Sequence, residues 1–174
     1  MVYVLAILVI VLAAVLILAA TRPPSFEVKR SLEIEAPPGR IYPLLADFHQ
    51  WSRWSPYEKL DLAMQRSFSG AESGKGAVYA WEGNGKAGAG RMEIVEAAPE
   101  RGIDIKLDFI RPFRANNRAA FAFTQAGDAT RVTWSMQGAA PFVARLMGLF
   151  INMDRMIGKD FEQGLTNLKA AVEQ

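Results

Sequence analysis

The chain has 174 residues and a formal net charge of +2 at neutral pH, which is nearly neutral for its length. It contains no cysteine, and this excludes disulfide bonds, thiolate catalysis and cysteine-based zinc sites. No run of lysine and arginine exceeds two residues, so the sequence gives little support for a nucleic-acid-binding surface, and we expect no nucleic acid partner.

The N-terminal segment Met1 to Ala20 carries no charged side chain, and all 20 basic and 18 acidic residues follow it. A run of about 20 apolar residues is the length that an α-helix needs to cross the hydrocarbon core of a bilayer. Arg22, Pro23 and Pro24 end this run. The organisation that we predict is a transmembrane anchor over residues 1–21, a short proline linker over 22–25 and one domain over 26–174.

A secretory signal sequence is the alternative for this segment. Such a signal has a basic start, an apolar core of roughly 7 to 15 residues and an A-x-A-like cleavage site. Here no basic residue precedes the apolar run, and Leu18-Ala19-Ala20 matches a cleavage site only loosely, so a retained anchor is favoured. Because Arg22, Lys29 and Arg30 follow the span and no basic residue precedes it, we expect a single-pass protein of the inner membrane whose domain faces the cytoplasm.

The domain begins with a predicted strand, because apolar and polar residues alternate over residues 26–36. Arg30 falls on the apolar side of this alternation. A bulge or a slipped register would explain its position. If the strand is regular, the guanidinium points inward, where it must be paired and would orient the polar group of a ligand. Pro37 and Pro38 then end the strand and open a short helix.

From Leu60 onward the pattern predicts about six strands separated by turns. The turns are expected at residues 70–76, 83–86, 99–102, 112–117 and 126–128. Asn84-Gly85 favours a tight two-residue hairpin. The segment Gly83 to Gly88 also spells the glycine pattern of dinucleotide-binding loops, but that pattern requires a helix to follow, and residues 91–95 are typical of a strand.

After Gly138 the apolar period changes from two to 3.6, which predicts one long C-terminal helix. Its apolar stripe comprises Leu146, Phe150, Met153, Ile157, Phe161, Leu165, Leu168 and Val172. This stripe needs a partner surface, and the face of the preceding sheet is the only one wide enough. We therefore predict an α+β fold in which a curved antiparallel sheet of about seven strands wraps around the C-terminal helix.

Four groups of residues follow one another along the domain in a familiar order. They are Phe48-x-x-Trp51-x-x-Trp54-Ser55-Pro56, Trp81-x-Gly83 with Gly88-x-Gly90-x-Met92, Thr130-x-Val132-x-Trp134-x-Met136-x-Gly138, and Asp154-x-x-x-Gly158-x-Asp160-Phe161-Glu162-x-Gly164-Leu165-x-x-Leu168-Lys169. In this order they resemble the SRPBCC superfamily of START-like helix-grip proteins, particularly its bacterial polyketide cyclase/dehydrase and lipid transport branch. The resemblance implies an apolar pocket for lipids, sterols, quinones or polyketides, but no single reaction.

The residues that we expect to line such a pocket are Arg30, Trp54, Trp81, Phe109, Phe121, Trp134, Met136 and Phe161. All but Arg30 would supply the apolar wall. Residues of these types also form ordinary cores, and the sequence does not separate the two roles. The aromatic cluster of Trp51, Trp54 and Tyr57 either lines a pocket mouth or plugs the end of the sheet. The segment 111–114 is either an exposed turn or a contact with anionic lipid headgroups. The segment 142–151 is apolar on more than one face, which favours a lid or a membrane-facing entrance.

No nucleophile–base pair, metal cluster or phosphate-binding loop is evident, so we expect no catalytic residue, cofactor or metal. The leading hypothesis is a membrane-anchored, non-catalytic carrier or sensor of an apolar small molecule such as a lipid, isoprenoid or polyketide. One alternative is a cyclase or dehydratase, in which a buried carboxylate such as Asp160 or Glu162 acts as general acid or base. The other is a protein-interaction module whose core is simply filled.

Overall fold

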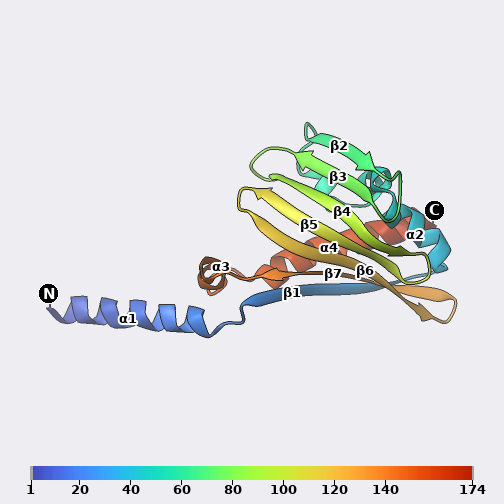
Figure 1. Cartoon of the computed structure of the whole chain (residues 1–174). Coiled ribbons are helices and arrows are strands. Elements are labelled where there is room, and N and C mark those ends of the chain that lie inside the picture. Colours follow the sequence, from blue (N-terminus) through green and yellow to red (C-terminus); the bar gives the residue numbers. More distant parts are fainter. Residues whose placement is uncertain (1, 174) are drawn as a thin grey trace.

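The computed structural model describes residues 2–173, and Figure 1 shows a twisted sheet with a long helix along one face and a straight helix leaving the domain. The helices are α1 (Val2–Thr21), α2 (Pro38–Ala46), α3 (Phe142–Met147) and α4 (Met153–Glu173), with two short 3-10 helices, η1 (Phe48–Arg53) and η2 (Pro56–Lys59). The strands are β1 (Ser25–Ile34), β2 (Gln65–Gly70), β3 (Ala77–Glu82), β4 (Ala89–Ala98), β5 (Gly102–Arg111), β6 (Ala115–Ala126) and β7 (Ala129–Ala139).

The strands form one antiparallel sheet of seven strands in the order β1-β7-β6-β5-β4-β3-β2. From β2 to β7 each strand pairs with the next one in the chain, which is a meander. The first strand, β1, pairs with the last, β7. The helix α4 packs against β1 and β7. The predicted α+β arrangement, a seven-stranded sheet around a long C-terminal helix, is therefore confirmed.

The pairing of the strands places several of the connections between them at one end of the sheet, the end from which α1 leaves the domain. Ser25 pairs with Ala139 there, Gln65 pairs with Glu82, and Glu82 in turn pairs with Ala89. We call this end the α1 end. It comprises the connections 22–24, 60–64, 83–88, 112–114 and 140–152, and lies at the left of the domain in Figure 1. The helix α1 is long and apolar enough to cross a membrane, a property that signal sequences share.

The C-terminal apolar stripe is divided between two helices, so the prediction of one helix through Leu146 and Phe150 is wrong. The helix α3 ends at Met147 and α4 begins at Met153. Asn152 starts α4, because its side-chain oxygen accepts a hydrogen bond from the backbone N–H of Arg155 at 2.9 Å. A side chain that satisfies an unpaired backbone donor in this way is a preferred helix start.

Two turns also differ from the sequence prediction. Strand β6 already begins at Ala115, so the predicted turn over residues 112–117 is shorter and Asn117 belongs to the strand. The β3–β4 turn occupies residues 83–88 and is longer than a two-residue hairpin. Asn84 closes it, because its side-chain oxygen accepts hydrogen bonds from the backbone N–H groups of Lys86 and Ala87 at 2.8 and 3.2 Å.

Trp134 on β7 lies at the centre of the contact between the sheet and α4. Its ring stacks on Phe161 of α4 with centroids 4.0 Å apart and on Phe121 of β6 with centroids 4.9 Å apart. A Cβ atom added to Gly164 would lie 2.6 Å from the ring of Trp134, closer than two such atoms approach. Glycine at this position is therefore what lets α4 lie flat on the indole.

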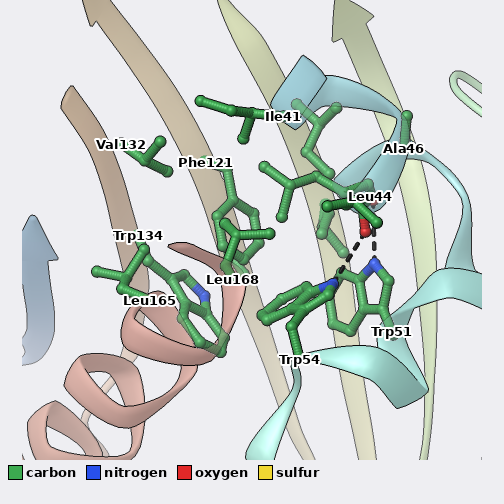
Figure 2. Close-up of a cluster of buried hydrophobic side chains, with 14 of the residues drawn as sticks. Ile41, Leu44, Ala46, Trp51, Trp54, Phe121, Val132, Trp134, Leu165 and Leu168 are labelled. Carbon is green, nitrogen blue, oxygen red and sulfur yellow. Dashed lines mark hydrogen bonds between the residues drawn. The ribbon is translucent and has the colours of Figure 1, made fainter. Parts of the chain in front are cut away.

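The aromatic cluster between η1 and α2 packs inside the core (Figure 2). Trp54 is fully buried, and its indole N–H donates to the backbone carbonyl of Leu44 at 2.9 Å. The indole N–H of Trp51 donates to the carbonyl of Leu45 at 3.0 Å. These bonds satisfy the polar atoms of both tryptophans without water. Both side chains therefore fill the interior beside the last turns of α4.

The register of β1 against β7 has no break, and Arg30 lies opposite Trp134. The interpretation of Arg30 by a bulge or slipped register is therefore wrong, and the side chain points toward α4. Its Nε donates to Glu162 at 2.8 Å and one terminal nitrogen donates to Asp154 at 2.9 Å. Gly158 leaves room for the guanidinium, because an added Cβ would lie 2.0 Å from it.

These ion pairs change the acidity of both partners. Hydrogen bonds that Arg30 donates to the carboxylates, that of Asp154 first, raise the pKa of Arg30 above its ordinary value. The hydrogen bond from Arg30 holds the pKa of Asp154 below its ordinary value. The side chain of Asp154 is 58% exposed, so this pair is screened by solvent and acts mainly to orient the first turns of α4.

Substitution of Gly164 by Ala is expected to destabilise the fold by about 1–3 kcal/mol, because Trp134 is held between two rings and cannot retreat from a new methyl group. Chemical denaturation of the purified protein measures this difference. Gly39→Ala is the matched control, since a Cβ there meets nothing within 4 Å, and it should leave stability unchanged or slightly higher. Equal stability of the Gly164→Ala variant and the wild type would show that the indole packing is not tight.

Substitution of Asp154 by Asn is expected to lower the thermal unfolding midpoint at neutral pH and to lose this effect in acid. Folding lowers the pKa of Asp154, so its carboxylate stabilises the folded state above the ordinary value of 3.8. That contribution disappears as the pH falls through the lowered pKa. The midpoints of wild type and variant should therefore converge well below pH 3.8, whereas Asp128→Asn in the exposed β6–β7 turn should differ little from wild type throughout.

Candidate functional site

The eight residues predicted to line a pocket all lie on the side of the sheet that faces α4, or pack against that side, but they differ in burial. Five are buried in the core, and these are Trp54, Phe121, Trp134, Met136 and Phe161. Three are half-buried, and these are Arg30, Trp81 and Phe109. The structure thus divides the predicted set into a packed group and a partly exposed group.

The packed group fills the middle of the interior with aromatic rings. Trp54 meets Phe121 and Trp134 edge-on, with centroids 5.6 Å apart in both pairs. Figure 2 shows these three side chains turned toward one another between the sheet and α4. Rings at these separations and angles make favourable contacts, and this packing is that of an ordinary protein core.

Two residues of the partly exposed group, Trp81 and Phe109, lie at the α1 end. The rings of Trp81 and Phe109 meet edge-on at 6.0 Å, and the indole N–H of Trp81 donates to the carbonyl of Ala87 at 3.0 Å. Met92, Leu107 and Met136 lie on the same face, by register, and are more deeply buried. We call these five residues, Trp81, Met92, Phe109, Leu107 and Met136, the half-open apolar surface.

Asn117 is the polar residue of this region, and the sequence analysis missed it. It lies on β6 opposite Leu107 of β5 and Gly138 of β7. Its side-chain carbonyl oxygen is buried and has no hydrogen-bond partner, while its amide nitrogen meets the sulfur of Met136 at 3.8 Å. A Cβ on Gly138 would lie 2.1 Å from that oxygen, so glycine provides the space that the amide occupies.

An unpaired buried oxygen of this kind costs the folded state about 1–3 kcal/mol. Pockets for small molecules are mostly apolar, with a few polar groups that orient the ligand. Asn117 beside the half-open apolar surface has this composition. The signal was present in the sequence, because Asn117 shares the apolar parity of Ala119 and Phe121, but the predicted turn over 112–117 obscured it.

The two carboxylates considered as acid or base lie in different surroundings. Glu162 is exposed and bound to Arg30, whereas Asp160 is half-buried beside the hydroxyl of Tyr57. Burial raises the pKa of Asp160 above its ordinary value. Burial and the neighbouring Asp160 raise the pKa of the Tyr57 hydroxyl, whose ring meets Trp134 edge-on at 6.1 Å.

Two hollows in the surface lie away from the α1 end. One of about 610 Å³ is lined by α2 and the end of α4, including Arg40, Tyr42 and Ala171. The other, of about 390 Å³, adjoins the β4–β5 turn, and Phe121 is the one predicted residue that lines it. Neither includes Asn117 or the half-open apolar surface. Within residues 2–173, no three or more histidine, aspartate or glutamate side chains are arranged to hold a metal ion.

Solved structures of the same fold are numerous. Protein MLL2253 from Mesorhizobium loti superposes with a TM-score of 0.59 at 16% identity, covering 85% of this chain and 97% of its own. Protein CV1439 from Chromobacterium violaceum gives 0.58 at 15% identity, covering 87% and 99%. The Aha1 dimer from Colwellia psychrerythraea gives 0.56 at 16% identity, covering 85% and 96%. At these identities the likeness shows a shared fold alone.

No curated protein matches the chain in sequence. The sequence profile of one family does match, over residues 25–173, which is the whole sheet together with α2, α3 and α4. The matched region begins with the first residue of β1 and leaves out α1. The sheet order and the gripping α4 agree with the SRPBCC fold that the residues suggested. The chain therefore belongs to the polyketide cyclase/dehydrase and lipid transport family, which has the helix-grip fold of the SRPBCC superfamily.

Proposed function

We propose that this protein is a membrane-anchored, non-catalytic carrier or sensor that holds an apolar small molecule, such as a lipid, isoprenoid or polyketide, at the half-open apolar surface. Membership of the family is consistent with a hydrophobic ligand. In this proposal α1 remains in the inner membrane, and the basic residues that follow it keep the domain on the cytoplasmic side. The mean hydropathy of 3.3 in its most apolar stretch, without a charged residue, supports the anchor.

The observation that carries this proposal is the unpaired amide oxygen of Asn117 beside partly exposed aromatic rings. A fold stabilised only by its core would gain from leucine at this place, because the buried oxygen has no partner. A ligand hydroxyl or N–H group would satisfy the oxygen, while Trp81 and Phe109 would cover the apolar part of the molecule. The chemistry therefore suits an apolar molecule that has one small polar group.

Arg30 is less suited to this role than the sequence suggested. All three of its nitrogens donate to the carboxylates of Glu162 and Asp154, and one terminal nitrogen also donates to the backbone carbonyl of Lys29 at 2.7 Å. A ligand carboxylate would have to displace Asp154 or Glu162 from the guanidinium. In the proposed site Asn117 therefore takes the place of Arg30 as the polar contact.

Asn117→Leu in the full chain, purified in lipid nanodiscs, is expected to bind the co-purifying small molecule at least tenfold less than wild type. Leucine has a similar volume but removes the amide, so the thermal unfolding midpoint should stay the same or rise. Solvent extraction and mass spectrometry measure the bound molecule. Asn116→Leu is the matched control, because Asn116 lies on the opposite face, where its side chain donates to Asp108 at 2.6 Å, and this variant should retain wild-type binding.

Two results would contradict the proposal. If wild type carries no small molecule and does not bind any of a panel of lipids and quinones, the protein-interaction alternative with a filled core is favoured. If Asn117→Leu retains the molecule at the wild-type level, the ligand binds elsewhere, and the hollow beside α2 and the end of α4 becomes the first place to test.

The cyclase or dehydratase alternative is favoured by one observation, the raised pKa of the half-buried Asp160 beside Tyr57. A raised pKa retains the proton at higher pH, as a general acid requires. An enzyme would convert the co-purified molecule on incubation, and Asp160→Asn would stop this conversion, while Glu162→Gln, whose carboxylate lies at the surface, would not. The carrier or sensor that we propose leaves the molecule unchanged in wild type and in both variants.

A further inference from the structure

The exposed apolar side chains of the domain gather at one place. Outside α1, every large apolar residue that is exposed within residues 2–173 lies at or beside the α1 end, except Phe68 on β2. We call this group the apolar patch, and it comprises Leu60, Leu62, Ile110, Phe113, Phe142, Val143, Met147, Phe150, Ile151, Met153 and Met156. It draws on three separate parts of the chain that the sheet register brings to the same end.

The patch is too exposed to serve the core. Leu62 is 90% exposed, Phe113 is 76% exposed and Phe150 is 77% exposed. Large apolar side chains stabilise a fold when they are removed from water, and these residues gain almost none of that stabilisation within the domain. Large apolar side chains exposed together at one end of a folded domain mark a surface that contacts a partner or a membrane.

The end of α1 is fixed to this patch by α3. One terminal nitrogen of Arg145 donates to the backbone carbonyls of Ala20 and Arg22 at 3.1 and 3.2 Å. These carbonyls belong to the last turn of α1 and the residue after it, where helical partners run out. Ala19 is fully buried at the same junction. The patch is therefore continuous with the place where the apolar span ends (Figure 1).

Basic residues accompany the patch. At the strand ends beside it, Arg111 of β5 is paired with Glu82 of β3 at 2.8 Å. The connections of the α1 end and the first turn of α4 contain Arg22, Lys86, Arg114, Arg145 and Arg155, against the acids Asp61 and Asp154. Of these two acids, Asp154 is already paired with Arg30. Near an anionic leaflet each exposed lysine or arginine is attracted by the negative surface potential of the lipid headgroups. Apolar side chains interleaved with basic ones are typical of surfaces that lie in the headgroup region of a bilayer.

We propose that the α1 end docks on the bilayer that α1 crosses, with α3 and the 112–114 turn inserted among the lipid headgroups. This inference rests on the proposed retention of α1 as an anchor. Beyond the anchor itself, the inference places the domain against the membrane surface in a defined orientation, not free in the surrounding water. The half-open apolar surface, which is at the same end, then opens toward lipid, so an apolar ligand passes between bilayer and protein with little exposure to water.

The absence of cysteine makes this inference directly testable, since one introduced cysteine is a unique labelling site. Phe113→Cys and Phe150→Cys are labelled with an environment-sensitive fluorophore in the full chain and reconstituted in nanodiscs with and without anionic lipid. Glu100→Cys, in the turn at the opposite end, is the water-exposed control, and Leu12→Cys reports whether α1 is inserted. Lipids with a quencher in the acyl chain near the headgroup or deep in the bilayer give the depth of each label.

We expect the headgroup-proximal quencher to reduce fluorescence severalfold more at positions 113 and 150 than at 100, with anionic lipid increasing the difference, and the deep quencher to act at position 12. Quenching at 12 but not at 113 or 150 would overturn the docking and leave the anchor intact. No quenching at 12 would overturn both. Shielding from water at 113 and 150 without lipid quenching, growing with protein concentration, would assign the patch to a second copy of the chain.

Discussion

The close approach of α4 to β1 and β7 is the contact on which the rest of the domain depends. Glycine permits it twice, once where Gly164 meets the indole of Trp134 and once where Gly158 meets the guanidinium of Arg30. Because α4 is held over β1 and β7, its Phe161 stacks on Trp134. These rings close the interior together with η1 and α2. The same placement leaves the inner face of β3 and β5 only partly covered at the α1 end. The packing of α4 on β1 and β7 thus accounts both for the closed interior beneath this helix and for the partly open surface at the α1 end.

The interior therefore combines two kinds of environment within one sheet. Around Trp134 the indole N–H groups of Trp51 and Trp54 are both hydrogen-bonded and the rings are at contact distances, so this region contributes stability. At the α1 end the residues are equally apolar, but Trp81 and Phe109 are half-exposed, and Asn117 retains an unpaired oxygen beside them. Residues retained at a cost to stability are commonly found where a protein binds or reacts. This contrast is the physical reason to look for the ligand at one end and not in the middle.

Local patterns predicted most of the fold, because alternation, prolines and the helical stripe act over a few residues. The site was harder, since it depends on partners far apart in sequence. Arg30 was ambiguous because its acids lie on α4, more than a hundred residues away. Asn117 fell within a predicted turn. Asn152, which caps the start of α4, lies inside an apolar stripe that continues on both sides of it, so the break between α3 and α4 was not predicted. Core and pocket wall use the same residue types, so only burial separates Trp54 from Trp81.

The connection between α1 and the sheet limits how far the domain can travel. Residues 22–24 alone separate Thr21 from Ser25, and a fully extended chain of this length reaches roughly 14 Å. The backbone carbonyl of Pro24 is also held by Ala140 at 2.7 Å, which shortens the free tether further. With α1 in a bilayer, the domain has no reach across an aqueous gap to a second membrane. Delivery would then require that the recipient diffuse to it in the plane of the same membrane, so that the search for a partner takes place in two dimensions.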